Sequence, residues 1–317
     1  MGQLVDGQWR TGEVGAGADG TFKRQDSRFR SWVTPDGAPG PTGVGGFAAA
    51  PGRYHLYVSL ACPWAHRTLI LRRLKGLEDM IDVSVVHWLM RDDGWTFAEG
   101  PGATGDAIHG ARFLHQVYSA ADPAYTGKVT VPVLWDKAGR TIVSNESADI
   151  IRMFNSAFDA VGARTGDYYP EPLRPRIDAL NDRIYATLNN GVYRAGFATT
   201  QAAYEEAVGP VFDTLDWLEG VLAPGGPWLL GEALTEADVR LFTTLVRFDP
   251  VYHGHFKCNR RRIVDYPALR DYVRRFAGLP GVAATIDLEH IKRHYYESHR
   301  GINPTGVVPV GPDPDLL

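Results

Sequence analysis

The chain has 317 residues, which is more than one hydrophobic core usually organises, so we expect two domains. Hydrophobic residues make up 44% of it and charged residues 22%, a composition that excludes a largely disordered protein. The net charge of −4 provides no basic field for nucleic acid or an anionic membrane, and no apolar run reaches the about 20 residues of a membrane span. Because the N-terminus lacks the apolar centre of a signal peptide, the sequence predicts a cytoplasmic protein with no nucleic-acid or membrane partner.

The two cysteines, Cys62 and Cys258, lie far apart in the sequence. Their number and spacing exclude a disulfide framework and are typical of a reducing compartment. A cysteine in a special structural position would therefore be a candidate for chemistry.

Residues 1–50 are rich in glycine, proline, serine and charge, and they show no sustained periodicity. We expect an irregular N-terminal arm. Gly43 and Gly45 resemble part of a dinucleotide fingerprint, but no strand precedes them and position 48 is Ala48. Since the sequence also has no phosphate loop, we expect no nucleotide cofactor.

Residues 51–165 show the element order of a thioredoxin-like domain. A strand is predicted at 54–58, a helix at 63–74 and a second strand at 82–88, and this β-α-β order implies parallel strands. Residues 131–143 predict a β-hairpin, after an irregular segment at about 89–127, and a helix is predicted to start near Glu146.

Residues 166–317 predict an all-helical domain with an extended Pro/Gly-rich tail, after a linker at 165–170. Thr235 and Asp238 have the spacing of a capping box at a helix start. The predicted helices cover residues 174–190, 200–222, 235–247, 266–277 and 280–296.

Cys62 lies between the first strand and the first helix, directly before Pro63. A helix N-terminus carries unpaired N–H groups and partial positive charge, which stabilise a thiolate and lower a cysteine's pKa. His66 and Arg67 would add positive charge or would lie on the helix surface. A small buried apolar residue is the alternative for Cys62, and placement alone leaves both open. Because position 65 is Ala65 rather than a second cysteine, any redox chemistry here is monothiol.

Two further segments suit a peptide-like ligand. Val131-Pro132 stands before a strand, where thioredoxin-like domains carry a cis-proline that leaves the Val131 backbone available for pairing. Glu146 and Ser147 begin a helix, where a carboxylate, a hydroxyl and free N–H groups suit an amino-acid end. A harmless proline at a strand start and a simple helix cap remain the alternatives.

His253, His255 and Cys258 have spacing that would suit a metal site, but no fourth ligand is apparent, so we expect no metal.

The segments Cys62–Arg67, Val131-Pro132 and Glu146-Ser147, followed by a helical half, resemble the glutathione transferases. The segments Arg247–Tyr252 and Ile291–His299 are similar to those of the glutathionyl-hydroquinone reductases, the xi class of that superfamily. The resemblance covers residues from about 5 to 305.

The resemblance implies a glutathione transferase fold, a homodimer, and removal of glutathione from an aromatic quinol conjugate through a Cys62–glutathione mixed disulfide. A second glutathione would release glutathione disulfide, so glutathione would be the co-substrate. It further implies roles for seven other residues. Trp95, Val131, Glu146 and Ser147 would bind glutathione. Tyr193, Tyr252 and Tyr295 would bind the quinol, and Tyr193 and Tyr295 would act in catalysis.

Three alternatives remain. An omega-like thiol transferase would keep the cysteine but reduce dehydroascorbate or mixed disulfides. Another low-molecular-weight thiol would replace glutathione. A binding module would keep the fold without chemistry.

Overall fold

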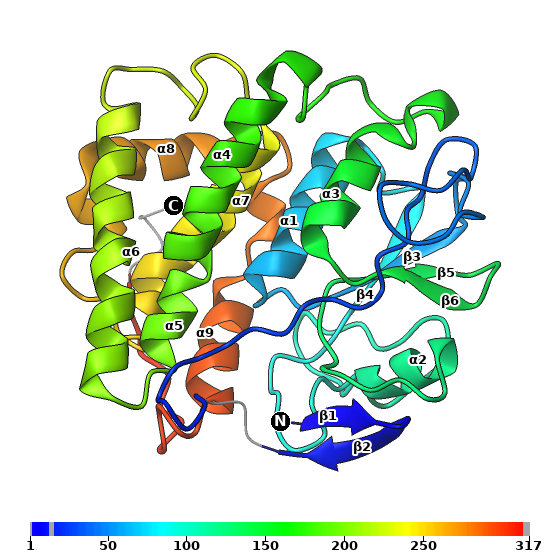
Figure 1. The fold of residues 1–317 in the computed structure, drawn as a ribbon, viewed down its shortest axis with the longest axis horizontal. Coiled ribbons are helices and arrows are strands. Elements are labelled where there is room, and N and C mark those ends of the chain that lie inside the picture. The colour runs from blue at the N-terminus through cyan, green and yellow to red at the C-terminus, as the bar shows by residue number, and fades with distance from the viewer. Residues whose placement is uncertain (1, 13–15, 313–317) are drawn as a thin grey trace. The chain divides into compact units, whose positions relative to one another are not determined.

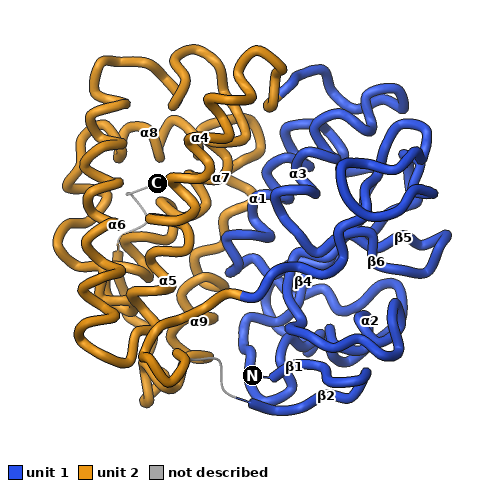
Figure 2. Tube along the Cα trace, viewed as in Figure 1, with its two compact units in different colours: residues 1–14, 25–167 blue, residues 15–24, 168–317 orange. Residues whose placement is uncertain are grey.

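The computed structural model describes residues 2–12 and 16–312 as two compact units, coloured in Figure 2. Unit 1 comprises residues 1–14 and 25–167, and unit 2 comprises residues 15–24 and 168–317. The parts of the predicted arm and tail at residues 1, 13–15 and 313–317 lie outside the described residues. Across the described ranges, no helix combines the length and apolar content needed to cross a membrane.

Unit 1 is built on a four-stranded sheet with the order β4-β3-β5-β6. Strand β3 pairs parallel with β4 and antiparallel with β5, and β5 pairs antiparallel with β6. Every residue of β3 is buried, as expected for a central strand covered on both faces. The strands are β3 (Tyr54–Val58), β4 (Ile81–Val85), β5 (Val133–Asp136) and β6 (Thr141–Ser144).

The α-helices in the described part of unit 1 are α1 (Pro63–Leu74), α2 (Leu114–Ala121) and α3 (Ser147–Ser156). Helices α1 and α3 pack together on one side of the sheet, and α2 lies near β6 on the other side (Figure 1). Pro63 occupies the first turn of α1. Arg72 and Arg73 lie in its last turn, where their positive charges interact favourably with the negative end of the helix dipole. The prediction of a thioredoxin-like domain is confirmed.

The prediction of wholly irregular structure is wrong at two places. Helix α2 lies inside the segment 89–127, and a hairpin of β1 (Gly2–Val5) and β2 (Gln8–Thr11) lies inside the arm. The hairpin turn uses Asp6 and Gly7, both at positive φ (48° and 72°), which is the geometry that Asp-Gly turns favour. The Asp-Gly pair was therefore a usable signal in the sequence.

Unit 2 is helical, as predicted, and the N-terminal residues 16–24 pack with it. Thr235 caps α7, and the Asp238 carboxylate accepts the Thr235 N–H at 2.9 Å, as the capping-box spacing predicted. The α-helices are α4 (Arg174–Ile184), α5 (Gly191–Gly196), α6 (Gln201–Leu222), α7 (Glu236–Arg247), α8 (Pro267–Ala277) and α9 (Leu288–Ser298).

Two helix predictions in unit 2 need correction. The helix predicted at 174–190 ends at Ile184 and continues as a π-helix, Tyr185–Asn189. The helix predicted at 280–296 begins only at Leu288, because Gly281 has a φ of +79° and Asp287 caps the helix by accepting the His290 N–H at 2.8 Å. A second π-helix, Phe248–Tyr252, follows α7. Single π turns occur frequently at functional sites.

Candidate active site

Cys62 is the N-cap residue of α1, with extended backbone angles of φ −78° and ψ 121°. Its carbonyl accepts the first helical hydrogen bond, from the His66 N–H at 3.0 Å. The side chain is partly exposed, unlike that of Cys258, which is buried. The N-terminus of a helix carries partial positive charge, which favours a thiolate in this place.

The Cys62 thiol lies 3.6 Å from the carbonyl oxygen of Val131, to which it donates a weak hydrogen bond. Val131 and Pro132 are joined by a cis peptide bond directly before β5. The structure thus brings together two of the residues singled out in the sequence.

His66 and Arg67, the basic residues in the first half of α1, are buried rather than on the helix surface. His66 is 0% exposed and Arg67 is 1% exposed. The Arg67 guanidinium lies over the Trp64 ring, 4.3 Å from its centroid, and donates to the Ser147 hydroxyl at 3.3 Å. Arg67 therefore joins the helix that carries Cys62 to the helix that begins at Ser147.

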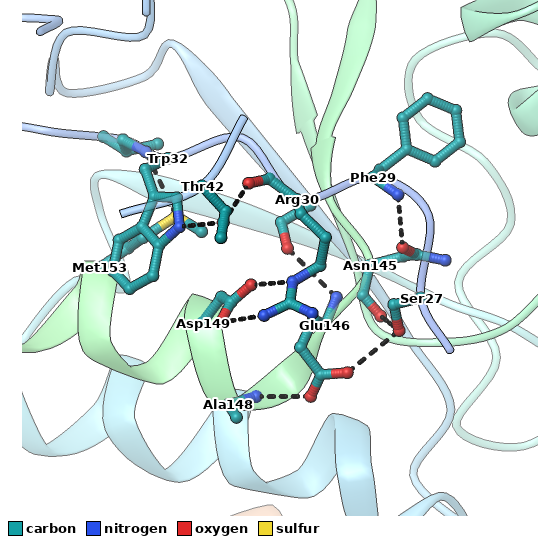
Figure 3. A network of polar contacts seen from close by, with 12 residues as sticks. Ser27, Phe29, Arg30, Trp32, Thr42, Asn145, Glu146, Ala148, Asp149 and Met153 are labelled. Atoms are coloured by element: carbon teal, nitrogen blue, oxygen red, sulfur yellow. Dashed lines mark hydrogen bonds and ion pairs between the residues drawn. The ribbon is translucent and has the colours of Figure 1, made fainter. Parts of the chain in front are cut away.

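Glu146 caps α3 with its own side chain, because its Oε1 accepts the Ala148 N–H at 3.0 Å. Its Oε2 accepts the Ser27 hydroxyl at 3.0 Å, so a residue of the arm contacts the same carboxylate (Figure 3). Ser147 at the first helical position is 3% exposed. A carboxylate, a hydroxyl and helix N–H groups are therefore gathered at one helix start, which suits a ligand with both ammonium and carboxylate.

Trp95 lies in the loop between β4 and α2. Its carbonyl accepts the Leu114 N–H at 2.9 Å, and its side chain is 7% exposed. Its role in binding glutathione stays a prediction.

Three tyrosines that are distant in sequence meet in unit 2. The Tyr295 hydroxyl, on α9, lies 2.5 Å from the Tyr193 hydroxyl on α5 and 3.2 Å from the Tyr252 hydroxyl at the end of the second π-helix. Burial raises the pKa of Tyr252 and of Tyr295 well above the usual value. These two hydroxyls therefore keep their protons at neutral pH and are able to donate hydrogen bonds to a phenolic oxygen.

The N-terminal residues that pack with unit 2 contact this tyrosine cluster. The Arg24 guanidinium lies 4.9 Å from the centroid of the Tyr193 ring and donates to Asn190 Oδ1 at 3.1 Å. The Phe22 ring stacks on those of Tyr193 and Phe197. Nothing in the periodicity of the arm predicted these contacts, because a loop that folds back on a distant helix leaves no local pattern.

His255 and Cys258, part of the spacing considered for a metal, pack inside unit 2. The His255 Nε2 lies 3.2 Å from the Nδ1 of His299, and burial lowers the pKa of His255 to about 3. Burial raises the pKa of the Cys258 thiol to about 12. Among the residues that the structure describes, no three potential ligands form a group suited to a metal ion.

Family models match both halves of the chain. Residues 61–157 match the glutathione S-transferase N-terminal domain, and residues 201–275 match the C-terminal domain. The glutathionyl-hydroquinone reductase YqjG of Escherichia coli is 60% identical, over 100% of this chain and 97% of the relative. The glutathionyl-hydroquinone reductase PcpF of Sphingobium chlorophenolicum is 58% identical over 98% of this chain and 96% of its own length. An omega-like glutathione S-transferase of Schizosaccharomyces pombe is 52% identical, over 94% of this chain and 95% of its own length.

Solved structures agree with these matches. The glutathione-bound structure of Escherichia coli YqjG superposes with a TM-score of 0.93 at 58% identity, over 99% of this chain and 97% of that one. The Xi glutathione S-transferase of Phanerochaete chrysosporium superposes with a TM-score of 0.89 at 52% identity, over 93% of this chain and 99% of that one.

Proposed function

The chain belongs to the xi class of the glutathione transferase family, and we propose that it removes glutathione from glutathionyl-hydroquinones with Cys62 as the nucleophile. The observation that carries the proposal is the position of Cys62, partly exposed at the N-terminus of α1 and 3.6 Å from the Val131 carbonyl. Because position 65 is alanine, an external thiol has to complete the cycle.

In the first step the Cys62 thiolate attacks the sulfur of the aromatic thioether. A sulfur–sulfur bond forms as the carbon–sulfur bond breaks, and its electron pair stays with the ring, where the carbon takes up a proton. The hydroquinone leaves, and glutathione remains on Cys62 as a mixed disulfide.

In the second step the thiolate of a free glutathione attacks the glutathionyl sulfur of that disulfide. The Cys62 thiolate is the leaving group, so the enzyme is restored and glutathione disulfide is released. The two steps together oxidise two glutathione sulfurs and replace the carbon–sulfur bond by a carbon–hydrogen bond. No metal or nucleotide takes part in this scheme.

The residues at the start of α3 suit the γ-glutamyl end of glutathione. Glu146 would accept hydrogen bonds from its ammonium, while Ser147 and the positive end of the helix would bind its carboxylate. The Val131 backbone would pair with the cysteinyl part, next to the Cys62 sulfur, and Trp95 would contact the tripeptide.

The tyrosines of unit 2 would bind the quinol. Tyr193 would donate a hydrogen bond to a quinol oxygen as charge develops on the ring, while Tyr295 would donate to the Tyr193 hydroxyl and accept from that of Tyr252 through their 3.2 Å contact. The raised pKa values of Tyr252 and Tyr295 support this role, because only a protonated hydroxyl donates.

An omega-like thiol transferase is the second candidate, favoured by the name of the fission-yeast relative. Turnover of dehydroascorbate and of a protein mixed disulfide, compared with turnover of glutathionyl-menadiol, separates the two. If the host makes another low-molecular-weight thiol instead of glutathione, turnover in the same assays should be faster with that thiol than with glutathione.

Two properties complete the proposal. The thiol chemistry requires a reducing compartment such as the cytoplasm. The family resemblance favours a homodimer. Light scattering in solution measures the molar mass, and a mass equal to that of one chain would contradict a dimer.

The function is tested with Cys62→Ala and with Cys258→Ala as the matched control, assayed on glutathionyl-menadiol with excess glutathione. Loss of the Cys62 thiol should abolish release of menadiol, whereas loss of the buried Cys258 thiol should leave kcat within about twofold of the wild type. Release by Cys62→Ala at the wild-type rate would overturn the proposal.

A further inference from the structure

Residues 27–33 of the arm run alongside the segment that leads from β6 into α3. The Ser31 N–H donates to the Val143 carbonyl at 3.0 Å, and the Asn145 N–H donates to the Phe29 carbonyl at 3.1 Å. Between these bonds, Arg30 forms an antiparallel bridge with Ser144. The pairing fixes the register of the arm, so each of its side chains has a set position next to the start of α3 (Figure 3).

Ser27 contacts the carboxylate that caps α3. Its hydroxyl lies 3.0 Å from Glu146 Oε2 and 3.2 Å from the Asn145 carbonyl, and its one proton goes to one of them at a time. The other carboxylate oxygen, Oε1, accepts the Ala148 N–H. Glu146 is thus held from two sides, by the helix and by the arm, and each oxygen still has a lone pair for a further donor.

Arg30 binds the second carboxylate of this helix turn. Its guanidinium forms a fork with Asp149, with Nη2 donating to Oδ1 at 3.0 Å and Nε donating to Oδ2. The side chain of Asp149 is only 10% exposed, and burial and the charge of Glu146 both raise the pKa of its carboxyl, while Arg30 opposes that shift. Since Arg30 pairs with Asp149, the negative charge of Glu146 is left to attract an ammonium group on a ligand.

We propose that Ser27 and Arg30 are positioning residues for glutathione: through Glu146 and Asp149 they hold the start of α3 in the geometry that binds the γ-glutamyl ammonium group. The inference rests on the proposed function, because it assigns arm residues to the same thiol site. In this arrangement the arm acts on the affinity for the γ-glutamyl group and leaves the reaction at the Cys62 sulfur unchanged.

The test compares Ser27→Ala with Ser31→Ala, which removes the same hydroxyl from the same stretch of the arm. The Ser31 hydroxyl accepts the Val44 N–H at 3.3 Å and serves as a matched control. Two substrates are used: glutathionyl-menadiol and the menadiol conjugate of cysteinylglycine, which lacks the γ-glutamyl group.

For Ser27→Ala we expect KM for glutathionyl-menadiol to rise about 3- to 10-fold, the effect of losing one ordinary hydrogen bond, because Ser27 acts on the ligand only through Glu146; kcat should stay within about twofold. KM for the cysteinylglycine conjugate should not change, and Ser27→Thr, which keeps the hydroxyl, should restore the wild-type KM. Ser31→Ala should leave both KM values unchanged. A merely structural role would instead change both conjugates alike.

Arg30→Met should raise KM for glutathionyl-menadiol by about 10-fold or more, since it removes the guanidinium that forms a fork with Asp149 beside Glu146. If that variant does not fold, Arg30→Lys keeps the charge but loses the fork, and a rise in KM for the glutathionyl conjugate alone is again expected.

Three outcomes separate the inference from its basis. If Cys62→Ala retains activity, the proposed function itself is wrong. An unchanged KM in Glu146→Gln removes the γ-glutamyl role of Glu146, and the inference fails with it. If Glu146→Gln raises KM but Ser27→Ala behaves like Ser31→Ala, the inference alone is wrong.

Discussion

The Tyr295 hydroxyl contacts the hydroxyls of both other members of the tyrosine cluster, Tyr193 and Tyr252. Its removal should therefore lower kcat/KM more than removal of either of the other two hydroxyls. It contacts the Tyr193 hydroxyl at 2.5 Å and the Tyr252 hydroxyl at 3.2 Å. Since a hydroxyl has one proton, Tyr295 donates to one neighbour and accepts from the other. Tyr295→Phe loses both contacts, whereas Tyr252→Phe loses only one of them.

The magnitude follows from the number of hydrogen bonds. Each neutral bond contributes about 1 kcal/mol, so Tyr295→Phe should weaken the ordered cluster by about 2 kcal/mol and Tyr252→Phe by about 1 kcal/mol. If the cluster binds the quinol oxygen in the transition state, kcat/KM for glutathionyl-menadiol should fall about 30-fold in the first variant and about 5-fold in the second. The steady-state release of menadiol measures both.

Tyr272→Phe is the matched control, because this buried tyrosine of α8 uses its hydroxyl elsewhere, on the Asp238 carbonyl at 3.1 Å. It should lower the melting temperature without lowering kcat/KM. The reasoning is refuted if Tyr295→Phe stays within twofold of the wild type, or if Tyr272→Phe loses as much activity.

Two further predictions concern the packing and the charge of unit 2. Gly196→Ala should lower both the melting temperature and kcat/KM, since its Cβ would lie 2.1 Å from the Cγ of Phe256, whose ring stacks on that of Tyr252. Gly209→Ala, whose Cβ would meet nothing within 4 Å, should instead stabilise the chain by up to about 1 kcal/mol. Equal melting temperatures of the two variants would contradict this prediction. Burial holds the pKa of His255 at about 3, so the unfolded chain binds a proton below pH 6.5 that the folded chain does not, and the free energy of unfolding falls as the pH drops. His255→Gln should flatten that dependence by up to about 1.4 kcal/mol per pH unit in urea titrations between pH 7 and 5, and an unchanged slope would be the contrary result.

The elements that the sequence predicted well are those whose cause is local. The buried strand Tyr54–Val58 and the helix after Pro63 are set by residues within each segment. Glu146 and Thr235 mark helix starts because each caps its own helix. The start of α9 at Leu288 also has a local cause, because Gly281 and Asp287 lie just before it; the predicted start at residue 280 overlooked these two residues.

Periodicity failed in two situations: where one kind of helix continues into another, and where distant segments make contact. The π-helix Tyr185–Asn189 is the first case, because it continues the helical pattern of α4 and periodicity alone does not separate the two. Arg24, Ser27 and Arg30 reach Tyr193, Glu146 and Asp149 only because the arm folds back on both units' helices. The grouping of the three tyrosines was expected from the family resemblance alone, since their spacing carries no common period.

The central claim, a Cys62–glutathione mixed disulfide, is tested most directly by mass spectrometry after a single turnover. The enzyme is mixed with a slight excess of glutathionyl-menadiol in the absence of free glutathione, quenched with acid and digested. We predict one glutathionyl group on the peptide that contains Cys62, with one equivalent of menadiol released, and its removal when glutathione is added before the quench. Menadiol released without an adduct on Cys62, or an adduct found only on Cys258, would contradict the account.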